Sequence, residues 1–169
     1  KPCFAYCSIF PKGFRFDKDT LVRMWIAQGY IQPRDNQLME HIGSVYFDNL
    51  YQMSFFQLHK IDDYQDDYYV MHDLINDFAQ KIFPEGRGRI VAGDGEVPEQ
   101  VRHVSLHLDG SDSTAFQNFR KYKKLRTLMI YAPDVITAPA LDVLREFKYM
   151  RVLVLECRKI YEFPESIGH

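Results

Sequence analysis

The sequence predicts an α+β chain with two parts, and three observations predict this class. Up to residue 83, helical spacings of apolar residues surround two short aromatic runs. Between residues 84 and 100, glycine and proline interrupt the pattern. From residue 101, one apolar template recurs three times at nearly constant spacing. We therefore expect a first domain over 1–83, a linker over 84–100 and an incomplete repeat domain over 101–169.

Composition and charge narrow the class of protein. The 169 residues are 46% hydrophobic and 26% charged, which argues against disorder. A net charge of −2 gives no global attraction to nucleic acid or acidic membranes. Three cysteines fit a reducing compartment, and no apolar run is long enough to span a bilayer. We expect a cytoplasmic protein, and a fragment, because the chain lacks an initiator methionine and begins inside an apolar pattern.

Three helices are expected before the first aromatic run. The first carries Cys3, Tyr6, Cys7 and Phe10 at helical spacing and ends before Pro11. In the second, Asp17 or Asp19 can cap the start and Gly29 can close the end in the left-handed conformation, with an apolar face of Leu21, Val22, Trp25 and Ile26. The third helix has an expected apolar stripe, interrupted once by a polar residue, of Leu38, Ile42, Val45, Tyr46, Asn49, Leu50 and Met53.

A hairpin and a closing helix complete the first domain. Residues 55–59 and 68–71 contain enough aromatic and branched side chains to form strands. The polar residues 60–67 are expected to form the loop that joins them. Helical spacing then returns at Leu74, Ile75, Phe78, Ala79 and Ile82. Three helices, a two-stranded wing and a closing helix predict a winged-helix domain.

The second part predicts the start of a leucine-rich-repeat α/β solenoid. The templates Val101-x-x-Val104-x-Leu106, Leu125-x-x-Leu128-x-Ile130 and Met150-x-x-Leu153-x-Leu155 are 24 and 25 residues apart. This spacing suits a solenoid in which each turn supplies one short strand to a parallel sheet. We expect Leu125, Leu128 and Ile130 to face inward, with the residues displayed on the sheet surface among Arg126, Thr127, Met129 and Tyr131. An uncapped solenoid end exposes apolar surface, so we expect the isolated fragment to aggregate.

Several motifs resemble one protein family. Residues 3–11 followed by 21–31 resemble the opening of the winged-helix segment in plant nucleotide-binding (NB-ARC) leucine-rich-repeat disease resistance proteins of the coiled-coil class. Met71-His72-Asp73 resembles the Met-His-Asp motif that closes this segment, and residues 102–106 resemble the start of the repeats. Tyr30 stands where many relatives carry Phe. The resemblance covers nearly the whole chain.

The resemblance implies a role in plant defense as part of an ADP/ATP-dependent switch. It implies that His72 faces the β-phosphate of ADP, which upstream domains mostly hold, with Met71 and Asp73 in support. The implied partners are the upstream nucleotide-binding domain and the later repeats of the same receptor. A pathogen effector or a guarded host protein is a further candidate. No nucleic acid is implied.

The sequence alone also allows a purely structural role for this motif. His72 could cap the following helix or bond a backbone carbonyl, while Asp73 offsets the helix dipole and Met71 packs in the core. Near the N-terminal end of a helix, we expect a mainly neutral imidazole that donates one hydrogen bond.

We do not expect the fragment to be an enzyme or to bind a nucleotide or metal alone. It lacks the phosphate-cradling G-x-x-x-x-G-K-[ST] motif, and we interpret the glycines between 86 and 95 as linker. Cys3 and Cys7 have no second pair at zinc-site spacing, so we expect buried core thiols. Ser105, His103 and Asp109 show no strained nucleophile turn.

Two alternatives remain at this stage. A winged-helix DNA-binding protein is disfavoured because residues 1–83 hold 8 basic against 11 acidic side chains, and because the wing contains Asp62, Asp63, Asp66 and Asp67. A free-standing leucine-rich-repeat scaffold is the other.

Overall fold

The computed structural model divides the chain into two compact units, Lys1–Pro84 and Glu85–His169. It describes residues 2–34, 36–60, 67–82, 87–91, 99–107, 121–132, 135–136 and 142–160. Within these ranges, no helix has both the length and the apolar character needed to cross a membrane.

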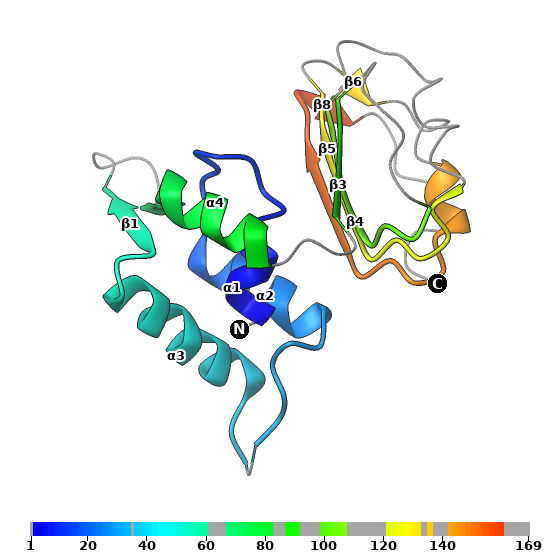
Figure 1. The fold of residues 1–169 in the computed structure, drawn as a ribbon. Coiled ribbons are helices and arrows are strands. Elements are labelled where there is room, and N and C mark those ends of the chain that lie inside the picture. Colours follow the sequence, from blue (N-terminus) through cyan, green and yellow to red (C-terminus); the bar gives the residue numbers. More distant parts are fainter. Residues whose placement is uncertain are drawn as a thin grey trace. The chain divides into compact units, whose positions relative to one another are not determined.

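The first unit is a winged helix of four helices and one hairpin (Figure 1). Its elements are α1 (Pro2–Cys7), α2 (Lys18–Ala27), α3 (Met39–Gln52), β1 (Phe56–His59), β2 (Tyr68–Met71) and α4 (Asp73–Ile82). The hairpin is antiparallel and pairs Phe56 with Met71. Helix α2 packs against α3, and α4 packs against α1. The expected wing tip over 61–66, with Asp62, Asp63 and Asp66, lies outside the described residues.

Helix caps in this unit follow the expected chemistry. Asp17, one of the two candidates, is the N-cap of α2, and its carboxylate accepts a hydrogen bond from the Thr20 N–H at 2.8 Å. Gly29 follows the helix with φ of 76°, the left-handed conformation that glycine adopts without strain.

Aromatic side chains form the core of the first unit. Trp25 and Tyr6 are fully buried, and Phe10 is 1% exposed, as the sequence indicated. The ring of Phe47 stacks on Phe56 at 5.0 Å between centroids and meets Tyr69 edge-on at 4.7 Å. These rings fill the space between helices and hairpin, and such pairs add about 0.5–1.5 kcal/mol each to the burial of their area.

The expected apolar stripe of α3 is wrong in part. Leu38, Val45 and Met53 are 74%, 43% and 55% exposed. The buried face contains Ile42 together with Gly43 and Phe47, which the expected stripe omits. The large ring of Phe47 and the close approach at Gly43 turn this face toward α2 and the hairpin. The prediction for α4 is also wrong in part. Ala79 is buried, as expected, but Leu74, Phe78 and Ile82 are exposed, and the polar Asn76 is buried instead.

The second unit contains a parallel sheet in the order β3-β4-β5-β7. Its strands are β3 (Arg87–Val91), β4 (His103–His107), β5 (Thr127–Tyr131) and β7 (Val152–Glu156). Two short strands, β6 (Val135–Ile136) and β8 (Lys159–Ile160), also pair in parallel, and a 3-10 helix covers Asp142–Glu146. The three template segments form strands β4, β5 and β7, which lie side by side as parallel strands, as predicted.

Strand β3 lies within the segment that the sequence predicts as linker. It pairs with β4 in register, Arg87 beside His103 and Val91 beside His107. Its glycine and two arginines hide the strand from pattern analysis, because β propensity is low for glycine. The pairing with β4 supplies the backbone hydrogen bonds that the strand needs.

The core of the second unit lies on one side of this sheet. Leu125, Leu128 and Ile130 are at most 1% exposed, as predicted, and join a cluster with Val104, Leu106, Leu144 and Phe147. The expectation for the opposite side is wrong for two residues, because Thr127 and Met129 are fully buried. Thr127 gains a partner there, since its Oγ1 lies 3.1 Å from Nδ1 of His103. The central strand β5 is thus buried on both faces.

Candidate functional site

The Met-His-Asp motif spans the junction between β2 and α4. Met71 is the last residue of β2 and is 3% exposed, so its side chain belongs to the core. His72 lies between the two elements and is exposed. Asp73 begins α4 and is exposed in its first turn. The side chains of His72 and Asp73 are therefore exposed to solvent, and the side chain of Met71 packs in the core.

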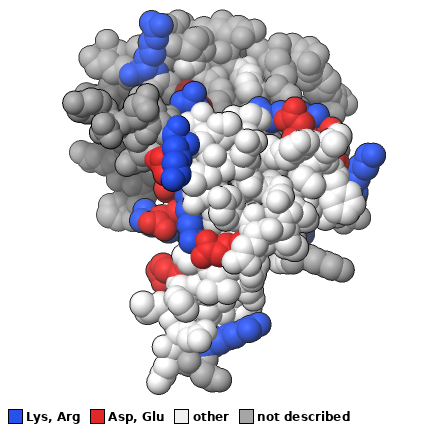
Figure 2. Space-filling model, turned by 90° about the vertical axis from the view of Figure 1, so that its left-hand side faces the viewer, with Lys and Arg blue, Asp and Glu red and all other residues white. Residues whose placement is uncertain are grey.

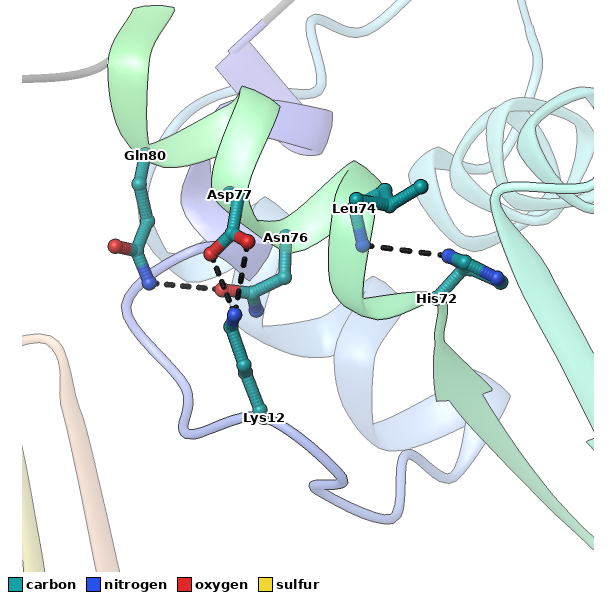
Figure 3. A network of polar contacts seen from close by, with 6 residues as sticks. All are labelled: Lys12, His72, Leu74, Asn76, Asp77 and Gln80. Atoms are coloured by element: carbon teal, nitrogen blue, oxygen red, sulfur yellow. Dashed lines mark hydrogen bonds and ion pairs between the residues drawn. The ribbon is translucent and has the colours of Figure 1, made fainter.

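Three hydrogen bonds hold His72 in place. Its backbone N–H donates to the Phe55 carbonyl at 3.3 Å, and its carbonyl accepts from the Asn76 N–H at 2.9 Å. Its Nδ1 accepts from the Leu74 N–H at 3.3 Å (Figure 3). This last bond shows the capping interaction that the sequence allowed. It satisfies one of the free N–H groups at the start of α4.

The other ring nitrogen, Nε2, has no hydrogen bond to any described residue. It lies beside the N-terminal end of α4, where the helix dipole favours negative charge. An exposed imidazole at such a position can donate a hydrogen bond to an anion, and the adjacent backbone N–H groups can add to it. Asp73 opposes this locally because its carboxylate is also negative.

Polar contacts that the sequence did not indicate support the position of α4. Nζ of Lys12 lies 2.7 Å and 2.8 Å from the two carboxylate oxygens of Asp77. This hydrogen bond raises the pKa of Lys12. On the same helix, the Gln80 amide donates to Oδ1 of the buried Asn76 at 2.8 Å (Figure 3). Lys12 is 65 residues from Asp77, so no local pattern could have paired them.

The remaining candidates are structural. Cys3 and Cys7 are buried free thiols, as expected. Burial raises the pKa of Cys3 to about 11 and raises the pKa of Cys7 well above its ordinary value. Ser105 Oγ lies 3.1 Å from Nε2 of His107, but Ser105 is only 4% exposed, and Asp109 lies outside the described residues. In the described part of the chain, no three His, Cys, Asp or Glu side chains are grouped as metal ligands.

Charges do not gather into a basic patch on the face shown in Figure 2. Lysine and arginine side chains lie close to acidic ones there and leave a broad uncharged area. Among the described residues, Lys12 pairs with Asp77, and Lys18 pairs with Asp48 with 2.6 Å between Nζ and Oδ1. Such neutralised pairs attract phosphate backbones poorly.

Comparison with known proteins identifies the family. The model of the disease resistance protein winged-helix domain matches residues 9–79. The chain belongs to the disease resistance protein family. It is 39% identical over 134 residues to an RPP13-like disease resistance protein of Arabidopsis thaliana, covering 76% of this chain and 12% of that protein. It is also similar to disease resistance protein RGA2 of Solanum bulbocastanum, with 29% identity over 99% of this chain and 15% of the relative.

This disease resistance chain is short compared with its relatives. Disease resistance protein RPM1 of Arabidopsis thaliana is 24% identical over 99% of the chain, which covers 18% of that protein. The chain thus spans less than a fifth of the length of these relatives. The matched residues 9–79 include the whole hairpin and the motif at 71–73.

Proposed function

We propose that the chain is the regulatory portion of an intracellular, cytoplasmic plant immune receptor and restrains and transmits an ADP/ATP-dependent switch. The observation that carries this proposal is the position of His72. Its ring is exposed at the N-terminal end of α4 and has a nitrogen without a described partner, although the residue before it is buried.

In the full receptor, His72 would contact the β-phosphate of ADP, and the upstream nucleotide-binding domain would supply most of the site. The residues present fit this role because a helix N-terminus and an imidazole both favour an anion. ADP or ATP supplies the phosphate charge that the switch senses. This chain contributes His72 as a hydrogen-bond donor, with Met71 anchoring the motif in the core and Asp73 beginning the helix.

The exposed face of α4 supports a contact with other domains of the receptor. Leu74, Phe78 and Ile82 are 72%, 52% and 46% exposed and follow one another at spacings of four residues. Large apolar side chains in such a row are typical of an interaction surface. We assign this face to the closed, ADP-bound arrangement, because it begins two residues after His72.

The parallel sheet supports the assignment of a leucine-rich-repeat solenoid to the second unit. Strands β4, β5 and β7 are spaced by 24 and 25 residues and share one apolar core on one side of the sheet. That arrangement suits the first turns of a solenoid. The later repeats, and a pathogen effector or guarded host protein, would act on the switch through them.

The experiment that tests this proposal is an ADP dissociation measurement on the full receptor. His72→Ala removes one hydrogen bond, worth about 0.5–1.5 kcal/mol or up to about 3 when charge-assisted. We expect the dissociation rate constant to rise between about twofold and a hundredfold, with a bias toward the active arrangement. His41→Ala, which removes an exposed imidazole from α3, is the matched control. Equal dissociation rates in the His72→Ala and parent receptors would contradict the proposal.

DNA binding is a weaker candidate function. At the described end of the wing, Lys60 and Asp67 are exposed and carry opposite charges. A DNA-binding wing needs basic residues at this position. A gel shift that persists at low salt and weakens steeply as salt rises would support this alternative.

A further inference from the structure

The two ring nitrogens of His72 have different surroundings. Nδ1 accepts the hydrogen bond from the Leu74 N–H. A backbone N–H can only donate, so Nδ1 must present a lone pair and carry no proton while this bond is formed. In a neutral imidazole, the proton is then on Nε2.

The backbone of His72 fixes where the ring can lie. The bond to Phe55 ties the residue to the segment before β1, and the bond from Asn76 is the first intrahelical bond of α4. His72 is therefore the N-cap of α4, and its side chain accepts from the second helical residue, as N-cap side chains do. Figure 3 shows Nδ1 turned toward Leu74, with the other nitrogen on the far side of the ring.

We infer that His72 divides two tasks between its ring nitrogens: Nδ1 caps α4, and Nε2–H is the donor that the ring presents outward. The identity of the group that accepts from Nε2, a phosphate, rests on the proposed function. The capping role of Nδ1 does not. The His72 side chain thereby links the N-terminus of α4, through Nδ1, to an anion that accepts a hydrogen bond from Nε2–H.

Two amide substitutions separate these tasks. In His72→Asn, the side-chain oxygen can accept from the Leu74 N–H, because Asn is among the best N-cap residues, but nothing reaches the position of Nε2. In His72→Gln, the longer side chain can place an N–H near that position, but Gln is not a favoured N-cap.

The tautomer is tested first, on the 169-residue chain labelled with nitrogen-15 in its histidines. The His72 signals are assigned by their loss in His72→Asn. At neutral pH, we expect the Nδ1 signal of an unprotonated acceptor nitrogen and the Nε2 signal of a protonated one. A neutral ring with its proton on Nδ1 overturns the inference, whatever the receptor does with nucleotide.

Stability and ADP retention then test the two tasks separately. Urea unfolding of the chain should show a folding equilibrium constant about fivefold lower for His72→Ala and His72→Gln, but within about twofold of the parent for His72→Asn. In the full receptor, ADP retention should follow a different order, with His72→Gln above His72→Asn and His72→Ala. Equal stability of all three variants overturns the capping role. Parent-like ADP retention in all three overturns the outward role of Nε2 and the proposed function, while the capping role stands on the stability order.

Discussion

Asp17 shows how one residue links sequence pattern to stability. The sequence left two candidates for the cap of α2, and the structure selects Asp17, which has extended backbone angles and bonds the Thr20 N–H. Its hydrogen bonds with Thr20 hold the pKa of Asp17 below its ordinary value. Folding therefore favours the ionised carboxylate.

This shift predicts how the stability of the first unit depends on pH. The stabilisation by Asp17 is present above the unfolded-state pKa, about 4, and is lost as the pH falls through the lower pKa of the folded state. Asp17→Asn should retain most of the cap and reduce this acid-dependent loss, because Asn caps as well as Asp but does not titrate. The measurement is the free energy of unfolding between about pH 6 and pH 2.

Asp17→Ala is the comparison for this experiment. It should lower stability by about 0.5–2 kcal/mol at neutral pH, since the free N–H groups of α2 lose their acceptor. If Asp17→Asn lost as much stability on acidification as the parent, the ionised cap would not be the source of the effect.

The Met-His-Asp motif was recognisable as sequence, but its geometry was not. Met71 is buried in the core, as expected. For His72, the sequence allowed both a capping role and a phosphate contact. The choice depends on which nitrogen faces the helix, and only the folded turn between β2 and α4 determines that.

At the scale of elements, periodicity located the helices and template strands but did not always orient them. It placed α3 within one residue at each end, yet it assigned Leu38, Val45 and Met53 to the core and omitted Phe47. Apolar residues surround much of this helix, so its pattern fits more than one buried face. The aromatic partners of Phe47 on the hairpin decide between them, and they are distant in sequence.

Alanine substitutions on α3 test this orientation. Phe47→Ala should lower the free energy of unfolding by about 3–5 kcal/mol, because it leaves a cavity among Trp25, Phe56 and Tyr69. Leu38→Ala should change it by less than about 0.5 kcal/mol, because Leu38 is 74% exposed. Urea denaturation of both variants gives the comparison, and similar losses would contradict the orientation.

Gly43 sets the distance between α2 and α3. A Cβ at this position would lie 2.5 Å from Cγ1 of the buried Val22, closer than packed atoms tolerate. Gly43→Ala should therefore destabilise the first unit by about 1–3 kcal/mol, although alanine has the better helix propensity. Thermal unfolding measures the change. A more stable Gly43→Ala variant would mean that the gain in helix propensity outweighs the close contact with Val22. Ser44→Ala, which also raises helix propensity, is the control.

At the scale of the whole molecule, the chain consists of two compact units with different cores. The first has a largely aromatic core that includes the fully buried Trp25, and the second has a largely aliphatic core on one side of a parallel sheet. The recurring template at 24 and 25 residues made the strands β4, β5 and β7 predictable. Strand β3 carries no such template, so only its pairing with β4 reveals it.

Trp25 makes the two units separately observable. It is the only tryptophan of the chain and is fully buried in the first unit. Leu128→Ala should destabilise the second unit by about 2–5 kcal/mol. We expect the circular-dichroism transition of the sheet to move to lower urea while the Trp25 fluorescence transition stays in place. Lys124→Ala, an exposed change in the same unit, is the control, and a parallel shift of both signals would show that the units unfold together.

The most direct test of the proposed switch is an experimental structure of the ADP-bound full receptor. We predict that Nε2 of His72 lies about 3 Å from an oxygen of the β-phosphate, within hydrogen-bond distance. We also predict that Nδ1 keeps its bond to the Leu74 N–H and that α4 packs its exposed apolar face against another domain. A structure in which the His72 ring points away from the nucleotide, with another side chain or solvent at the β-phosphate, would contradict the proposal.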